Sequence, residues 1–265
     1  MDIAKADFIE GMAKGMAVLE SFDTERQRLN ATLAAQRAGI TRAAARRHLL
    51  TLAHLGYLES EDGYYWLSPK VLRFSGSYLA SARLPRVLQP TLNRLAAQTQ
   101  QSFSGVVLDD DQVVIVARSV GSGTSYPDKL QSAAPRVLAY GLHLGARLPA
   151  HATSTGRMLL ACMPRNQLSD WIKNHELPRL TPHTITDSKT LRTLVTEARG
   201  QDWCVARQEH ELGVFALALP LRNMRGVTVA ALNVVTTPER LELSAMQRDL
   251  LPLLLDAARE LRPLL

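Results

Sequence analysis

Residues 30–55 have the sequence NATLAAQRAGITRAAARRHLLTLAHL, and this stretch predicts two short helices joined by a tight turn. Asn30 can cap the first helix because its side-chain oxygen can accept a backbone N–H of the first turn. Gly39 ends that helix, since glycine readily takes the left-handed conformation found at helix ends. Thr41 can then cap a second helix that runs to about Leu55.

Basic side chains collect around this pair of helices. Between Thr24 and Leu58 one acid, Glu25, stands against six arginines, namely Arg26, Arg28, Arg37, Arg42, Arg46 and Arg47. In the second helix, spacings of four and one place two arginines on one face and a third beside it. Such a helix fits the major groove of DNA, where arginine can bond guanine through two hydrogen bonds. The alternative is a solvated basic helix in an ordinary three-helix domain.

Apolar residues indicate which sides of these helices are buried. Residues 9–22 predict an amphipathic helix whose apolar residues recur at spacings of three and four, namely Ile9, Met12, Met16 and Leu19. For the helix after Thr41, we expect the buried side to comprise Leu49, Leu50, Leu52 and Leu55. Three helices of this kind can enclose a small core.

A hairpin follows the basic helix. Residues 56–67 hold two β-prone runs around Asp62-Gly63, a strong signal for a two-residue hairpin turn. This hairpin would form a wing beside the helices. We therefore expect contacts to double-stranded DNA from the basic loop, the second helix and the wing, made by Arg28, Thr41, Arg42, Ala43, Ala44, Arg46, Arg47 and Tyr64.

The chain is long enough for two domains. Its 265 residues exceed the usual single-domain size, and a break at Leu84-Pro85 separates two helical patterns. We place a winged helix-turn-helix domain with a linker helix at 1–83 and an effector-binding and oligomerisation domain at 84–265. In the second, strands are expected at 103–108, 113–119, 203–208, 214–221 and 227–236, and helices at 153–163, 165–175, 187–200 and 244–261. This order predicts an α+β fold with an antiparallel sheet.

Composition excludes several classes of protein. Hydrophobic residues make up 46% of the chain and charged residues 21%, and no apolar run approaches the roughly 18 residues that cross a bilayer. The first residues, MDIAK, lack the pattern of a secretory signal, so we expect a cytoplasmic protein with no membrane partner. Cys162 and Cys204 have no CxxC spacing and no neighbouring histidine. We therefore expect no disulfide, no metal and no cofactor.

No catalytic set is evident. His175-Glu176 and His210-Glu211 both lack the second histidine of an HExxH zinc motif. The glycine-rich residues 121–124 form neither a GxSxG elbow nor a phosphate loop. We therefore expect no catalytic residue and no enzyme. Two other hypotheses stay open, a hydrolase that uses the winged domain as an interaction module and an architectural DNA binder without a ligand.

Segments along nearly the whole chain resemble IclR-type transcriptional regulators, namely Gly15–Leu19, Gly39–Arg47, Leu52–Tyr57, Pro149–Arg157, Trp203-Cys204, Glu209–Gly213 and Ala231–Val234. The run TRAAARR at 41–47 and Leu148-Pro149-Ala150 look closest to the Pca/Pob branch. Residues 120–140 depart from the family pattern by being longer and less regular.

The resemblance implies both an architecture and partners. It implies a GAF-like effector domain and a homodimer or dimer of dimers on a pseudo-palindromic operator. It also implies an activator of aromatic-acid catabolism that works with RNA polymerase and responds to 4-hydroxybenzoate, protocatechuate or β-ketoadipate. The alternative within the family is a repressor that responds to a small aliphatic carboxylic acid.

Residues 152–156, Ala-Thr-Ser-Thr-Gly, precede an apolar helix and could hold a carboxylate through hydroxyl and backbone N–H groups. A plain helix cap is the alternative. Around this turn we expect effector contacts from Arg118, Tyr126, His151, Thr153, Ser154, Thr155 and Gly156, although Arg118, Tyr126 and His151 could equally be surface or structural residues. The resemblance adds Cys204, Glu209, Ala216 and Asn233, and the Asn233 amide could instead be satisfied by the backbone.

Overall fold

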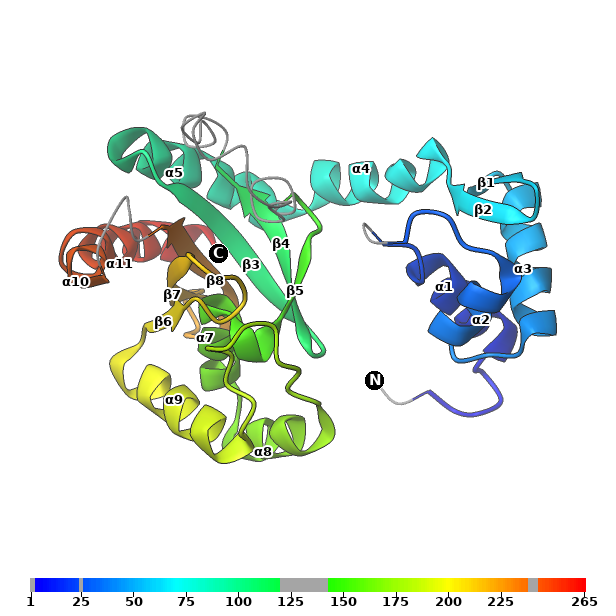
Figure 1. Cartoon of the computed structure of the whole chain (residues 1–265). Coiled ribbons are helices and arrows are strands. Elements are labelled where there is room, and N and C mark those ends of the chain that lie inside the picture. The colour runs from blue at the N-terminus through cyan, green and yellow to red at the C-terminus, as the bar shows by residue number, and fades with distance from the viewer. Residues whose placement is uncertain (1–2, 24–25, 120–142, 238–242) are drawn as a thin grey trace. The chain divides into compact units, whose positions relative to one another are not determined.

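The computed structural model describes residues 3–23, 26–119, 143–237 and 243–265. The chain forms two compact units, Met1–Ser81 and Ala82–Leu265 (Figure 1). Each unit has its own core, and each is described by itself below. Tyr126 and the whole of the irregular segment 120–140 that departs from the family pattern, with its neighbours to 142, lie outside the described residues.

The N-terminal unit is a winged helix-turn-helix. Its elements are α1 (Glu10–Glu20), α2 (Ala31–Arg37), α3 (Arg42–His54), β1 (Leu58–Glu61), β2 (Tyr64–Leu67), the short 3-10 helix η1 (Pro69–Val71) and α4 (Leu72–Ser81). The predicted caps are confirmed, since the Asn30 side chain accepts the N–H groups of Thr32 and Leu33, and Thr41 accepts that of Ala44. Gly39 has a φ of +64° at the turn between α2 and α3.

The core of this unit differs in part from the predicted one. It is built around Val18, Leu29, Ala34, Ala45, Leu49 and Leu58. Ile9, Met12 and Met16 of the predicted apolar stripe are exposed, because α1 packs on α3 through the side that carries Val18. Leu50 is exposed as well, since one helical residue step turns a side chain about 100° away from Leu49. Leu55, the C-cap residue that follows α3, is also exposed.

The C-terminal unit contains one six-stranded sheet with the strand order β5-β4-β3-β8-β7-β6. The strands are β3 (Ser102–Asp109), β4 (Gln112–Arg118), β5 (Arg147–Pro149), β6 (Cys204–Arg207), β7 (Phe215–Arg222) and β8 (Thr228–Thr236). Every pairing is antiparallel, which confirms the predicted α+β class. Strand β5 was not predicted, because a three-residue edge strand has no alternating pattern of its own.

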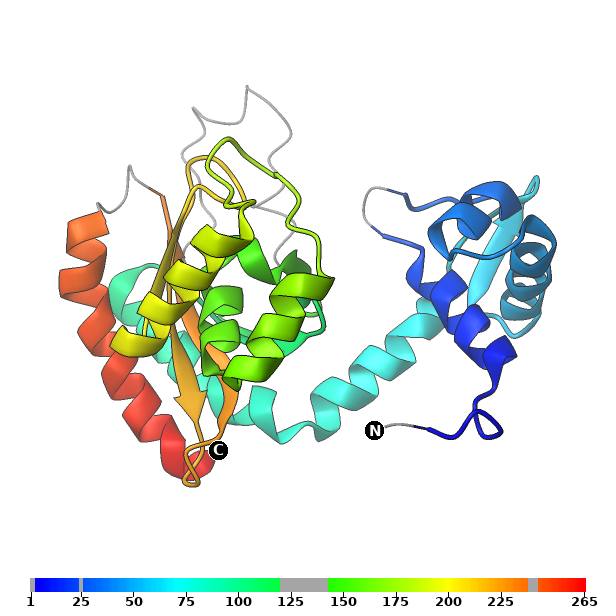
Figure 2. The same cartoon turned by 90° about the horizontal axis from the view of Figure 1, so that it is seen from below.

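Helices cover both faces of this sheet (Figures 1 and 2). One face carries α5 (Arg83–Thr99) and the C-terminal helix, which runs through α10 (Leu243–Ala245), a π-helical turn (Met246–Leu250) and α11 (Leu251–Leu261). The other carries α7 (Ser154–Cys162), α8 (Arg165–Asn174) and α9 (Ser188–Gln201), with α7 packed directly on the strands. Each face therefore has its own apolar core. No helix in the described ranges is both long and apolar enough to cross a membrane.

Candidate effector pocket and DNA-binding surface

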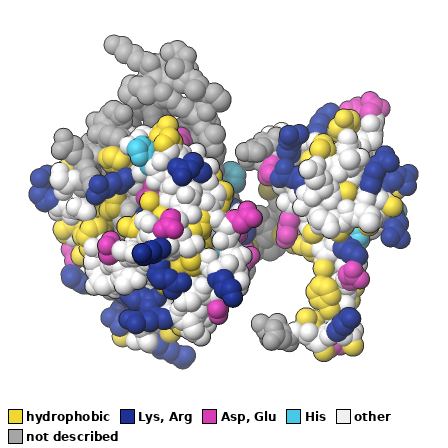
Figure 3. Space-filling view, turned by 60° about the horizontal axis from the view of Figure 1, so that its bottom comes forward, with side chains coloured by type: hydrophobic (Ala, Val, Ile, Leu, Met, Phe, Trp, Pro, Cys, Tyr) yellow, Lys and Arg dark blue, Asp and Glu magenta, His cyan; other side chains and the backbone are white. Residues whose placement is uncertain are grey.

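Helix α3 presents a basic side to solvent. Arg42, Arg46 and Arg47 are exposed, while Ala45 and Leu49 of the same helix are buried in the core. Ala43 is exposed between the arginines, and Ala44 is half-buried with its N–H held by the Thr41 side chain. Figure 3 shows Lys and Arg side chains over the visible surface of this unit. The sequence pattern thus becomes a helix whose exposed side carries cations and small residues.

A second basic group, Arg28 in the loop before α2, lies against the wing, where its guanidinium is 3.9 Å from the Glu61 carboxylate. The backbones of Leu29 and Tyr65 exchange two hydrogen bonds of 2.9 and 2.8 Å, so the loop before α2 is tied to β2. The Arg28 guanidinium lies 4.2 Å from the ring centroid of Trp66 on this strand, an arrangement that favours a cation over an aromatic face. Tyr64 is exposed at the start of the same strand.

The C-terminal unit contains a largely apolar cavity between the start of α7 and the sheet. Its empty volume is about 600 Å³ including the open mouth. Strands from both halves of the sheet contribute, and so does the loop after β6. The lining residues are Ser104, Val106, Val113, Ile115, Leu148, Ala152, Thr153, Ser154, Thr155, Ala206, Glu209, His210, Glu211, Val214, Ala216, Asn233 and Val235.

The first turn of α7 supplies polar groups to this cavity. Thr153 caps the helix, because its hydroxyl accepts the N–H of Gly156 at 3.1 Å and its carbonyl accepts that of Arg157. The N–H groups of Ser154 and Thr155 have no acceptor within the helix, as in any first turn. Both residues line the cavity, so the helix start offers hydrogen-bond donors where the helix dipole favours negative charge.

Gly156 holds this turn close to the preceding one. A Cβ atom at Gly156 would lie 2.1 Å from the carbonyl oxygen of Ala150, so no larger residue fits without a shift of backbone. Gly156 does not line the cavity. Gly156 therefore allows α7 to pack closely on Ala150 and donates its N–H to the Thr153 cap, while its neighbours Ser154 and Thr155 line the cavity.

Three buried polar atoms in the cavity wall lack partners. Among the described residues, the buried side-chain atoms without a hydrogen bond are Ser154 Oγ, His210 Nδ1 and Asn233 Oδ1, and all three residues line this cavity. Asn233 lies on β8 between Ser104 of β3 and Ala218 of β7. A buried polar atom without a partner is costly, so these three atoms are available to bond a polar ligand or an ordered water in the cavity.

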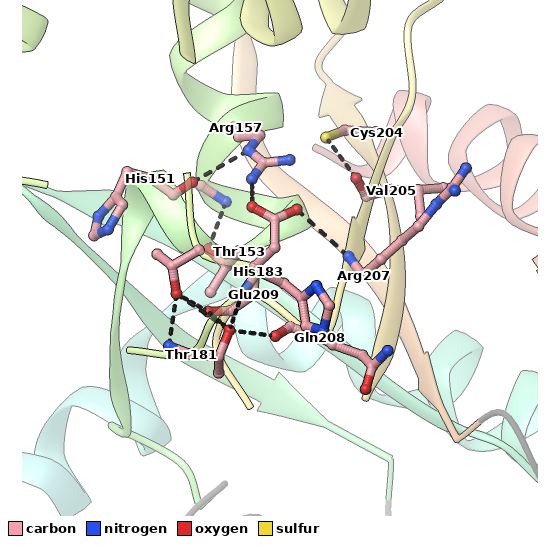
Figure 4. Close-up of polar contacts among 12 residues, drawn as sticks. His151, Thr153, Arg157, Thr181, His183, Cys204, Val205, Arg207, Gln208 and Glu209 are labelled. Atoms are coloured by element: carbon pink, nitrogen blue, oxygen red, sulfur yellow. Dashed lines mark hydrogen bonds and ion pairs between the residues drawn. The ribbon is translucent and has the colours of Figure 1, made fainter. Parts of the chain in front are cut away.

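A buried ion pair joins the cavity lining to α7. Figure 4 shows Arg157 reaching from α7 to Glu209, and their side chains are only 3% and 9% exposed. The Arg157 Nε also donates to the carbonyl of His151 at 3.1 Å. The backbone carbonyl of Glu209 accepts the hydroxyl of Thr184 at 2.6 Å. The loop after β6 is thereby fixed to α7 and to the segment before α9.

Burial sets the protonation of the neighbouring groups. It lowers the pKa of His151 below its usual value of 6.5, although a hydrogen bond to the Pro178 carbonyl acts in the opposite direction. It lowers the pKa of His210 too, and repulsion from His151 adds to this. Burial raises the pKa of the Cys204 thiol to about 11. Both histidines and the thiol are therefore uncharged near pH 7.

The structure brings six of the expected effector residues to one cavity, namely Thr153, Ser154, Thr155, Glu209, Ala216 and Asn233. His151 and Cys204 are buried beside Arg157 and do not line the cavity. Arg118 ends β4, where its carbonyl accepts the Gln89 amide. The sequence reasoning missed His210 and the apolar wall of Val106, Val113 and Ile115. The period-2 alternation of β3 and β4 could have indicated that wall.

No cluster of three His, Cys, Asp or Glu side chains that could hold a metal ion occurs within the described ranges. The chain thus combines a winged helix-turn-helix that exposes a basic helix with a separate unit that holds a small, partly polar cavity. These two features define a DNA-binding transcriptional regulator that responds to a ligand.

Comparison with known proteins gives the family. The model for the IclR helix-turn-helix domain matches residues 11–62, and the model for the C-terminal domain of bacterial transcriptional regulators of the IclR type matches residues 76–262. The chain belongs to the IclR family of transcriptional regulators, as its resemblance predicted.

The chain is similar along most of its length to individual regulators within this family. The chain is 49% identical to the p-hydroxybenzoate hydroxylase transcriptional activator of Acinetobacter baylyi over 99% of this chain and 94% of the relative. It is similar, at 45% identity and a TM-score of 0.60, to the inducer-binding domain of a PobR double mutant from Acinetobacter in complex with 3-hydroxybenzoic acid, covering 68% of this chain and 98% of that one. An IclR homologue from Microbacterium hydrocarbonoxydans in complex with 4-hydroxybenzoate is 26% identical with a TM-score of 0.71, over 96% and 98% of the two chains.

Proposed function

We propose that this protein activates genes for aromatic-acid catabolism when a hydroxybenzoate, 4-hydroxybenzoate first among them, occupies the cavity at the start of α7. The observation that carries this proposal is the set of unpartnered buried atoms in the cavity wall. The hydroxyl of Ser154 and the first-turn N–H groups are donors suited to a carboxylate. The carbonyl oxygen of Asn233 is an acceptor suited to a phenolic hydroxyl.

The remaining wall suits an aromatic ring. Val106, Val113 and Ile115 are buried, and with Leu148 they form an apolar surface beside the polar groups. A cavity of this composition can bury a ring by the hydrophobic effect while a few polar groups fix its orientation. The relatives described above, whose names include p-hydroxybenzoate, 3-hydroxybenzoic acid and 4-hydroxybenzoate, support the same class of ligand.

The carboxylate contact can be tested by removing one hydroxyl. Ser154→Ala should weaken binding of 4-hydroxybenzoate about tenfold, since a hydrogen bond to a charged group contributes roughly 1.5–3 kcal/mol. Ser188→Ala is the matched control, because Ser188 occupies the same first position of α9 but is exposed. Calorimetric titration should also include protocatechuate, β-ketoadipate, glyoxylate and pyruvate. Failure of every hydroxybenzoate to bind the wild-type protein would overturn the proposal.

The hydroxyl contact has a test of its own. Asn233→Leu replaces the amide by an apolar group of similar size, so the acceptor for a phenolic hydroxyl is lost. The wild-type protein should prefer 4-hydroxybenzoate to benzoate, and the variant should bind the two with nearly equal affinity. A variant that keeps the full preference would place the hydroxyl elsewhere in the cavity.

We further propose that the protein acts as a homodimer, alone or as a dimer of dimers, with one copy on each half of a pseudo-palindromic operator. The N-terminal unit supports this, because Met12 on α1 and Leu72 on α4 are 67% and 66% exposed, with Met16 and Phe74 exposed nearby on the same helices. Exposed apolar surface of this kind commonly marks an interface with another protein. Met12→Lys with Met16→Lys should shift the molar mass measured by light scattering toward the monomer.

The activator proposal can be tested by measuring transcription in a purified system. With 4-hydroxybenzoate present, the protein should increase transcription by RNA polymerase from a promoter that carries its operator, in a purified system. The 4-hydroxybenzoate recovered after the assay should be chemically unchanged, because a regulator binds its effector without turnover. Consumption of the acid, or ligand-dependent loss of transcription, would contradict the activator proposal.

A further inference from the structure

The cavity wall contains a carboxylate where an acid is proposed to bind. This inference rests on the function proposed above, in which the ligand is a hydroxybenzoate. Two carboxylates line the cavity, Glu209 and Glu211. Glu209 is the buried one, at 8% exposed, whereas Glu211 is half-buried, so water screens its charge more. Two negative charges repel each other, and the repulsion grows when water is excluded from between them. Unless the charge of Glu209 is cancelled, the cavity should reject the ligand's carboxylate.

No Lys or Arg side chain occurs among the described residues that line the cavity. His210 lines it, but burial and the neighbouring His151 lower its pKa, so that it is neutral near pH 7. The dipole of α7 supplies only partial positive charge. A full positive charge that balances Glu209 must therefore come from a residue outside this part of the wall.

Arg157 is placed to supply that charge. It follows the first turn of α7, its side chain is 3% exposed, and it donates a hydrogen bond to the Glu209 carboxylate (Figure 4). The His151 carbonyl, which accepts from Arg157 Nε at 3.1 Å, holds the guanidinium in this orientation. Cys204 lies beside it, but that thiol carries no charge at neutral pH because its pKa is about 11. Burial lowers the pKa of Arg157, but an arginine keeps its proton in a protein, so the pair is neutral as a whole.

We propose that Arg157 is a positioning residue that makes the cavity accept an anion, because it cancels the charge of Glu209 from behind the cavity wall. The carboxylate of Glu209 then turns toward Arg157, and the ligand's carboxylate meets the donors at the start of α7. The discrimination between a charged acid and its neutral amide thus depends on a residue that touches neither.

A purely structural ion pair makes a different prediction. If Arg157 only clamps the loop after β6 to α7, its removal should weaken every ligand to the same extent. If it cancels charge, its removal should weaken the anion and spare a neutral ligand of the same shape. The ratio of affinities for 4-hydroxybenzoate and 4-hydroxybenzamide separates the two roles, because both carry the same ring and hydroxyl.

The experiment uses the full-length protein, Arg157→Gln, Glu209→Gln and the double variant, each titrated by calorimetry with both ligands. Relative to wild type, Arg157→Gln should lower the ratio of the affinity for the acid to that for the amide by about tenfold or more. A tenfold change corresponds to about 1.36 kcal/mol of lost interaction with the charged ligand. Glu209→Gln should shift the ratio toward the acid, because the cation is then unbalanced. The double variant should return the ratio to within about threefold of wild type.

Arg199→Gln is the matched control. Arg199 donates to the carbonyls of Ala161 and Met163 at the other end of α7, both at 2.7 Å, and does not line the cavity. Its removal deletes one arginine and weakens the same helix, so stability should fall while the ligand ratio stays constant.

The outcomes separate the two proposals. If wild type binds neither ligand, the proposed function fails. If wild type binds the acid but Arg157→Gln weakens acid and amide alike, only the role of Arg157 is overturned. Should Arg157→Gln fail to fold, Glu209→Gln and the double variant still decide, because an unchanged ratio in Glu209→Gln contradicts charge cancellation.

Discussion

The two units are incomplete in opposite ways. The N-terminal unit leaves apolar side chains of α1 and α4 in solvent, including Ile9, Met12 and Leu72. Among its described residues, the C-terminal unit has buried polar atoms without partners inside a cavity, those of Ser154, His210 and Asn233. Exposed apolar surface favours a second protein, and buried polar atoms favour a small polar ligand. The kind of incompleteness therefore indicates the kind of partner.

The two candidate sites are also assembled differently. The expected DNA contacts of α3 lie within six consecutive positions, 42–47, on a helix held by a small core. The cavity residues come from Ser104 to Val235, across both halves of the sheet. A change on α3 should therefore alter recognition with little effect on stability, whereas a change at the cavity should often alter both.

The largest expected effect is on the packing of α7. Gly156→Ala places a methyl group against the Ala150 backbone, so the free energy of unfolding of the C-terminal unit should fall by about 3 kcal/mol, the upper end of typical overpacking costs. Gly200→Ala on α9 is the control, since a Cβ there meets no atom within 4 Å. Alanine in that helix should be neutral or slightly stabilising. Denaturant unfolding followed by circular dichroism measures both, and equal stability of the two variants would contradict the packing argument.

The next effect concerns recognition without loss of stability. If Arg46 contacts a base, Arg46→Ala should reduce discrimination between operator and unrelated duplex by about 1–3 kcal/mol and leave thermal unfolding unchanged. Arg192→Ala removes the same charge from α9 in the other unit and should preserve discrimination. Binding isotherms at several salt concentrations give both quantities. An equal loss on all sequences would assign Arg46 to a phosphate.

A smaller effect is expected from pH on the C-terminal unit. The pKa values of His151 and His210 are lowered by burial, so below about pH 6.5 the unfolded chain binds protons that the folded unit does not. Their contribution to stability is therefore complete above that pH and is lost as the pH falls toward their folded-state pKa values. Thermal unfolding between pH 8 and 5.5 should show this decline, and His210→Gln should make it shallower. A variant with the same decline as wild type would exclude His210 as a cause.

The smallest effect concerns the wing. Trp66→Leu removes the aromatic face under Arg28, at a cost of about 0.5 kcal/mol for an exposed cation–π contact. Stability should hardly change, but DNA affinity should fall if the stacked arginine contacts the duplex. Trp203→Leu is the control, because Trp203 belongs to the C-terminal unit and its replacement should leave DNA affinity unchanged. Unchanged affinity in both variants would show that stacking on Trp66 does not support DNA binding.

Local patterns predicted most of the helices and strands because short-range physics decides them. The caps at Asn30 and Thr41, the turn at Gly39 and the hairpin at Asp62-Gly63 each depend on hydrogen bonds or backbone angles within a few residues. The edge strand β5 was missed because three residues carry no periodic signal, and it forms only by pairing with β4.

Burial was harder to predict than secondary structure. The stripe of Ile9, Met12 and Met16 has the period of a buried helix face, yet within one chain it is exposed. Periodicity shows that a face is apolar, but it does not show whether the same chain or a partner covers it. The exposed position of Leu50 likewise follows from how α3 meets its neighbours.

By itself the sequence determined the two-part organisation, the winged helix-turn-helix, the antiparallel sheet and the family, since caps, turns, periodicity and motif residues are properties of neighbouring positions. Tertiary structure alone decided that Ser154, His210 and Asn233 share one cavity, and that Arg157 faces Glu209 behind its wall. Residues 52 positions apart become partners only when α7 packs on the sheet and the loop after β6 returns to it. Charge balance in a buried site is set by that packing, which no local pattern records.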